Sequence, residues 1–173
     1  DVLINHARGT FILGVTNTVL AKRMQIMGQY TFRKMDADCA GQIVAWQYPP
    51  PYHIYNCHPN NVDAFVKGFI TRQYRYHSVW NPAGDLIAFR CFGKDAQVPG
   101  GDYRAEALDM GGGLRPDLTG QGFGAEIMQA AFEFALQNYT PLAFRATVAA
   151  FNQRALKVCK KVGYQPVQAF IST

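Results

Sequence analysis

The chain has 173 residues, 49% of them hydrophobic, which is enough for one domain with a substantial core. Its net charge is +5, but it has no arginine-rich block or basic tail, so an anionic small ligand fits better than a nucleic acid. The four cysteines form no CxxC pair and no zinc pattern with the histidines, which predicts reduced thiols, a cytoplasmic setting and no metal.

Hydrophobic periodicity and turn residues divide the chain into short strands and amphipathic helices. The predicted elements are strand 30–35, helix 36–48, a proline-rich aromatic loop at 49–60, helix 60–73, hairpin 74–93, strand 103–116, a helix from 123, strand 142–149, helix 152–162 and strand 164–171. This order predicts an α/β fold of packed layers around a mixed sheet.

Six of the 16 glycines lie between residues 111 and 124, after a predicted strand and before a helix. Such a loop can bind a phosphate, because backbone N–H groups and the helix dipole favour negative charge and no Cβ blocks the approach. An ordinary glycine-rich turn is the alternative. Gly120, Gly122 and Ala125 also fit the G-x-G-x-x-A form of a dinucleotide site, but no acidic residue follows about twenty residues later, and fewer than fifty residues remain.

Two segments carry a resemblance to a known family. Residues 114–135 (LRPDLTGQGFGAEIMQAAFEFA) resemble the pyrophosphate loop and helix of the GNAT superfamily of N-acetyltransferases. Residues 151–167 resemble its next signature, with Asn152, Ala155, Gly163 and Tyr164 in the family's order. The loop departs from the family at Thr119, where Gln or Arg is usual.

The resemblance implies an acyl-CoA N-acyltransferase fold. That fold has a mixed, mostly antiparallel central sheet, a splayed parallel strand pair and helices on both faces. Acetyl-CoA would lie between the splayed strands as cosubstrate, and its acetyl group would pass directly to a primary amine in a ternary complex. Asn152 could equally be a helix N-cap. The expected CoA-binding residues are Met110, Gly111, Gly112, Leu114, Thr119, Gly120, Gln121, Gly122, Phe123, Gly124 and Asn152.

The chemistry needs a base for the amine and help for the departing thiolate. Glu106 is the first candidate base, because it is expected on the strand that enters the site, and Asp109 is the second. Cys159 stands where the family often has a tyrosine acid. It is either a core thiol or a weak acid, and a thiolate with a pKa of about 8.5 can also leave unaided.

The stiff loop after the first helix offers rigid aromatic side chains for an acceptor pocket, or for packing against the sheet. The expected acceptor-site residues are Trp46, Tyr48, Tyr52 and Tyr55. The sequence leaves the amine open among a protein N-terminus, a lysine, a polyamine, an aminoglycoside and a small metabolite. A non-catalytic CoA-binding or regulatory module is the alternative function, and a ribosome- or RNA-associated modifier is a third.

The resemblance places the domain at residues 29–173 and leaves residues 1–28 as an extension, either an extra strand or disordered. Residues 10–15 (TFILGV) look like a strand. Because an exposed sheet edge invites aggregation, we expect this strand to cover one, in its own subunit or in a homodimer partner. The apolar run around it is too short and too polar to cross a bilayer, so no membrane partner is expected.

Overall fold

The computed structural model describes residues 9–16 and 29–172. Seven strands form one sheet in the order β2-β3-β4-β5-β6-β1-β7. The strands are β1 Gly9–Thr16, β2 Thr31–Lys34, β3 His77–Trp80, β4 Leu86–Phe92, β5 Leu108–Leu114, β6 Ala143–Ala149 and β7 Gln165–Ile171. All neighbours are antiparallel except β5 and β6, which run parallel. The predicted mixed, mostly antiparallel sheet is therefore confirmed.

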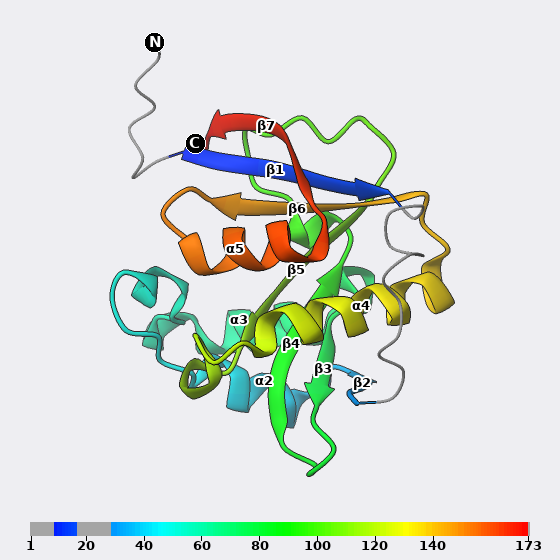
Figure 1. Cartoon of the computed structure of the whole chain (residues 1–173). Helices are drawn as coiled ribbons and strands as arrows, with labels where there is room; N and C mark the ends of the chain where they lie inside the picture. Colours follow the sequence, from blue (N-terminus) through cyan, green and yellow to red (C-terminus); the bar gives the residue numbers. More distant parts are fainter. Residues whose placement is uncertain (1–8, 17–28, 173) are drawn as a thin grey trace.

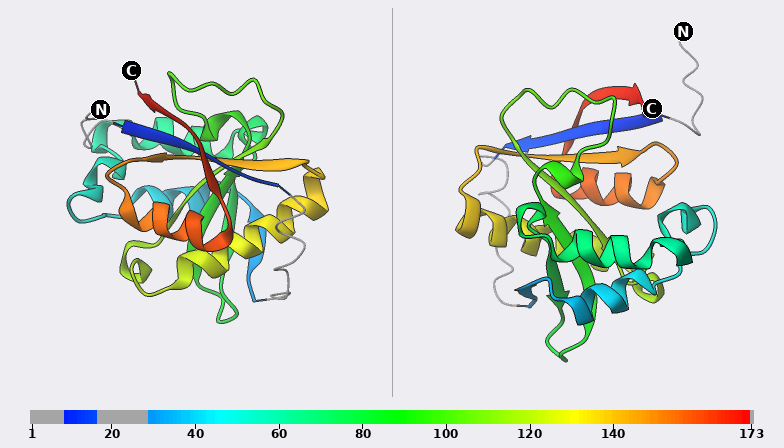
Figure 2. Two further views of the ribbon diagram at one scale, coloured as in Figure 1. Left: turned by 45° about the horizontal axis from the view of Figure 1, so that its top comes forward. Right: turned by 180° about the vertical axis from the view of Figure 1, so that it is seen from behind.

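Helices cover both faces of the sheet. Figures 1 and 2 show α4 and α5 on one face and α2 and α3 on the other. No described helix is long and apolar enough to cross a membrane. The helices are α2 Ala37–Val44, α3 Val62–Ile70, α4 Phe123–Tyr139 and α5 Gln153–Val162.

The helix boundaries follow capping chemistry that the sequence displays. The Asp36 side chain accepts a hydrogen bond from the Cys39 N–H at 2.8 Å and starts α2. Asn152 does the same for the Ala155 N–H at 3.1 Å and starts α5. Gly163 ends α5 in the left-handed conformation. These contacts satisfy groups that a helix end otherwise leaves unpaired.

The main core lies between the sheet and the α4–α5 layer. Phe92, Phe132 and Phe144 are fully buried there, together with Met110 and Cys159. The opposite face has a smaller core in which α2 and α3 pack on β3 and β4. The larger apolar layer therefore lies on the face that carries the glycine loop and α5.

The strand β1 lies inside the sheet. It pairs antiparallel with β6 on one side and with β7 on the other, so Thr10 faces both Ala149 and Phe170. Figure 1 shows it as the blue strand between them. We expected residues 10–15 to cover a sheet edge, but β7 occupies the outer position instead. Residues 1–8 and 17–28 of the predicted extension lie outside the described residues.

The strand predicted over residues 103–116 is shorter than expected, because β5 begins at Leu108. The residues before it form a loop whose polar groups are satisfied partly within the loop and partly by β6 and β7. The Asp102 side chain accepts from the Arg104 backbone and side chain, and the Tyr103 hydroxyl bonds the main chain of Val98 and the hydroxyl of Thr147. These side-chain contacts replace the ladder that a strand would use.

We predict that Ile12→Ala lowers the free energy of unfolding by about 3 kcal/mol, because it leaves a cavity in a packed layer. Ile12 is 1% exposed on β1. The matched control is Ile54→Ala, at a residue that is 61% exposed, which should change stability by less than about 0.5 kcal/mol. Urea denaturation monitored by fluorescence measures both values. Equal effects would show that β1 contributes little to the core.

Candidate active site

The parallel strands β5 and β6 separate within the sheet. Their ladder contains two residue pairs, Leu108 with Phe144 and Asp109 with Arg145. Beyond Asp109, β5 continues beside β4, while β6 continues beside β1. Figure 1 shows β6 crossing the upper part of the molecule, while β4 lies below it at a steep angle to β6. The predicted splayed parallel pair is present, with its vertex at Asp109 and Arg145.

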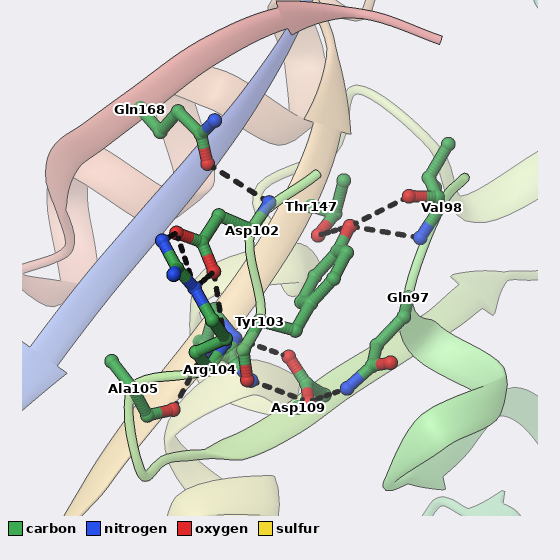
Figure 3. Close-up of polar contacts among 10 residues, drawn as sticks. Gln97, Val98, Asp102, Tyr103, Arg104, Ala105, Asp109, Thr147 and Gln168 are labelled. Atoms are coloured by element: carbon green, nitrogen blue, oxygen red, sulfur yellow. Dashed lines mark hydrogen bonds and ion pairs between the residues drawn. The ribbon is translucent and has the colours of Figure 1, made fainter. Parts of the chain in front are cut away.

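A buried ion pair holds this vertex. The Arg145 guanidinium donates to Asp109 Oδ1 at 2.5 Å and to Oδ2 at 2.9 Å, and Gln97 donates to the same Oδ2 at 2.8 Å. Arg145 also donates to the Ala105 carbonyl at 2.9 Å and lies over the Tyr103 ring. Figure 3 shows Asp109 between Gln97 and the loop of residues 102–105. Both carboxylate oxygens of Asp109 are thus already engaged in binding the two strands and the loop.

The structure changes the expected position of Glu106. This residue is exposed in the loop two positions before β5, so the prediction that it lies on the strand itself is wrong. The cause is the polar loop of residues 102–105, whose side-chain hydrogen bonds, including one to Thr147 on β6, take the place of strand pairing before Leu108. Glu106 would have to act as a base from that loop.

Consecutive glycines of β5 lie just beyond the vertex. Gly112 has a φ of +153°, and a Cβ there would lie 2.3 Å from the Phe89 carbonyl oxygen and 2.8 Å from Cδ of Arg90. A Cβ on Gly113 would lie 2.9 Å from the Tyr48 hydroxyl oxygen. Bare backbone is needed here because neighbouring side chains lie close to both faces of the strand.

The second glycine group forms the start of α4. Gly120 and Gly122 have φ values of +80° and +97°, and a Cβ on either would meet open space. Gly122 is the N-cap and supplies no side-chain cap, so the first-turn amides of this 17-residue helix stay available to an anion. Gly124 has a different reason, since its Cβ would lie 2.9 Å from Cγ2 of Val158 on α5. The loop therefore has free amides and open space at its two left-handed glycines, as the binding of a phosphate would require.

Sequence reasoning missed one cation at this loop. Arg154, in the first turn of α5, donates to the Thr119 hydroxyl at 3.1 Å and lies 4.5 Å from the Tyr52 ring centre. A basic residue two positions after the Asn152 cap was a visible signal. This signal indicates a phosphate-binding role only once the starts of α4 and α5 are known to be neighbours.

Asn152 and Cys159 both lie on α5. The Asn152 amide caps the helix with its oxygen and donates through Nδ2 to the Tyr55 hydroxyl at 3.3 Å. Cys159 is fully buried, and that burial raises the pKa of its thiol to about 11. All four cysteines are free thiols. No group of three or more His, Cys, Asp or Glu side chains that could hold a metal occurs in residues 9–16 and 29–172.

The predicted acceptor residues divide into two groups. Tyr52 and Tyr55 pack against Phe151 at the start of α5, beside the phosphate loop. The Tyr48 hydroxyl donates to the Leu114 carbonyl at 2.9 Å and so reaches the glycine strand. Trp46 lies apart from these residues, since it packs on Phe89 in the α2–α3 layer.

Comparison with known families gives the decisive observation. Residues 31–165 match the model of the family described as acetyltransferase (GNAT) domain. The chain belongs to this family. The chain therefore has the GNAT fold, as the sheet with its splayed parallel pair also indicates.

Solved structures share the fold of this GNAT chain at low identity. A GNAT-family acetyltransferase from Colwellia psychrerythraea is 14% identical with a TM-score of 0.64, over 96% of this chain and 56% of that one. A tandem GNAT protein from the clavulanic acid biosynthesis pathway is 12% identical with a TM-score of 0.64, over 95% and 52%. The aminoglycoside acetyltransferase AAC(6')-Ib in complex with coenzyme A is 13% identical with a TM-score of 0.64, over 79% and 84%.

The chain spans about half the length of the first two of these structures. Comparison with curated protein sequences found no match.

We predict that Gly122→Ala weakens CoA binding about tenfold, because a Cβ strains the left-handed turn that directs the amides. The matched control is Gly41→Ala in α2, where an added Cβ meets nothing within 4 Å. That change should leave CoA affinity intact and raise stability by about 0.5 kcal/mol. Isothermal titration with CoA measures both. Unchanged affinity in Gly122→Ala would contradict a phosphate role for this turn.

We predict that Asp109→Asn lowers the free energy of unfolding by about 3 kcal/mol, since it leaves the Arg145 charge buried without its partner. The double variant Asp109→Leu with Arg145→Met should recover most of that loss, because it removes both charges. Asp102→Asn is the control for losing an exposed carboxylate. Chemical denaturation tests the set, and a double variant as unstable as the single one would show that the pair acts through more than its charges.

Proposed function

We propose that this chain transfers an acetyl group from acetyl-CoA to a primary amine by direct attack within a ternary complex. The observation that carries the proposal is the uncapped, left-handed glycine turn at the start of α4 beside the splayed β5–β6 pair. The turn suits the pyrophosphate, and the splay suits the pantetheine arm and the thioester.

Donor binding would rest mainly on backbone groups. The amides from Thr119 to Gly124 hold the pyrophosphate, with Gln121 and Phe123 beside it, and Arg154 adds a positive charge at Thr119. The backbone of Met110 to Gly112 polarises the thioester carbonyl, and Leu114 and Asn152 border the pantetheine.

The reaction requires one bond formed and one broken. The amine nitrogen attacks the thioester carbon, the C–S bond breaks, and its electron pair goes to the sulfur of CoA. The amine proton goes to a base, for which Glu106 would act through water from its exposed position. Asp109 is less suited, because Arg145 and Gln97 occupy its oxygens. Cys159 would supply at most weak acid help.

The acceptor would enter from the α2–α3 side, where Tyr48, Tyr52 and Tyr55 offer rigid aromatic side chains. Trp46 would contribute only indirectly, because it packs on Phe89 away from these tyrosines. Rigid rings suit a small amine. Similar folds include a spermidine N-acetyltransferase chimera, 16% identical with a TM-score of 0.55 over 79% of this chain and 80% of that one. Together with the aminoglycoside enzyme, it supports a small-molecule amine as the acceptor class.

A non-catalytic CoA-binding module is the second candidate. One observation favours it: a buried thiol with a raised pKa stands where the family often has a tyrosine. Thiol release from acetyl-CoA across a panel of polyamines, aminoglycosides and lysine peptides separates the two. Turnover with any amine supports the enzyme, and tight CoA binding without turnover supports the module.

We predict that Arg154→Gln raises the KM for acetyl-CoA about fivefold and leaves kcat unchanged, because an exposed charge contact contributes about 1 kcal/mol to binding. The control is Arg33→Gln on β2, an exposed arginine that lies over Trp80. The increase should shrink at high salt. A fall in kcat without a change in KM would contradict a phosphate-binding role.

A further inference from the structure

Arg90 of β4 is a buried cation that has no anionic partner within residues 9–16 and 29–172. Arg90 is 8% exposed, and its Nε is buried with no hydrogen-bond partner among the described residues. The ion pairs among the described residues involve Arg104, Arg115 and Arg145. Of the chain's 12 Asp and Glu residues, only Asp1 falls outside the described ranges. An unpaired buried charge is costly, so a ligand anion is the natural partner.

Arg90 lies on the face of the sheet that would receive CoA. Phe92, two residues further along β4, packs on Phe134 of α4, and strand side chains repeat every two residues. His77, opposite Arg90 on β3, packs on the same Phe134 ring. Arg90 therefore shares its face with α4 and α5, which carry the phosphate loop and Asn152.

The guanidinium reaches across bare backbone toward the open splay. A Cβ on Gly112 would lie 3.1 Å from Arg90 Nη1, so a side chain there would displace the arginine. Gly112 lies three residues beyond the vertex, beside the segment proposed to hold the thioester carbonyl. The hydroxyl of Tyr164, the residue after the Gly163 stop of α5, is also buried and has no hydrogen-bond partner in the described part of the chain. Two unsatisfied polar groups on this face are what a site for a polar reacting group would present.

We infer that Arg90 is the electrostatic partner of the CoA sulfur and stabilises the thiolate as the C–S bond breaks. The inference rests on the proposed function. The electron pair of the C–S bond goes to sulfur, the amine proton goes to the base or solvent, and Arg90 keeps its own protons. Charge-assisted N–H···S⁻ contacts would take over the task of the family's tyrosine, which Cys159 replaces.

The titratable groups around Arg90 keep the same charge between pH 7 and pH 9.5. Burial raises the pKa of Cys91 and of Cys159 to about 11 and that of Tyr48 to about 12, and it also raises the pKa of Tyr164. Burial lowers the pKa of His77, so that imidazole is neutral above pH 7. A change in CoA binding between pH 7 and pH 9.5 therefore reports on the CoA thiol.

The test compares CoA with desulfo-CoA, which lacks the thiol, by isothermal titration from pH 7 to pH 9.5. An adjacent cation lowers a thiol pKa by about 1 to 2 units, so the preference for CoA over desulfo-CoA should grow about tenfold across this range. In Arg90→Gln the preference should stay flat within about twofold. Arg90→Lys should keep part of the growth, and Arg33→Gln should keep all of it.

Turnover and stability complete the test. Arg90→Gln should lower kcat about 100-fold, with the KM for acetyl-CoA changed less than about threefold. Its thermal unfolding midpoint should stay the same or rise, because a buried unpaired charge is removed. Equal pH dependence for CoA and desulfo-CoA in the wild type would overturn the inference and leave the proposed function standing. If neither CoA nor desulfo-CoA gave a heat of binding, both the inference and the proposed function would be contradicted.

Discussion

The ion pair between Asp109 and Arg145 is the constraint on which the site depends. Two parallel strands can diverge inside a sheet only if something fixes the last point at which they meet. Here a buried carboxylate and guanidinium on facing residues fix it, and Gln97 and the 102–105 loop hydrogen-bond to the same pair. The open region beyond the vertex is therefore set by charges whose separation would be expensive.

Two kinds of bare backbone serve two needs around that vertex. In β5 the glycines make room for side chains that already exist, such as Arg90 and Tyr48. In the loop before α4, Gly120 and Gly122 leave room that nothing in the described chain fills. The first arrangement packs the protein against itself, while the second leaves an approach for a ligand. The same residue type thus marks an interior contact and a binding surface.

The parts of this structure that the sequence predicted are those with local causes. The Asn152 cap, the Gly163 stop and the strand–glycine–helix succession each depend on neighbours within a few residues. What it missed depends on distant contacts. The start of β5 was misplaced because Tyr103 bonds Thr147 across the sheet. Arg90 and Arg154 become candidate ligand-binding residues only when β4, β5 and the two helix starts come together in the fold. Hydrophobic periodicity does not reveal such contacts.

The interior position of β1 has a consequence for how the chain reaches its fold. β1 leaves the ribosome well before both of its partners, since Thr10 must wait for Ala149 and Phe170. During synthesis this apolar segment has no native neighbour, and closing so long a loop is slow. Three of the seven strands, β6, β1 and β7, can therefore assemble only after residue 171 has been translated. Truncated nascent chains are thus the species most exposed to aggregation and to chaperones.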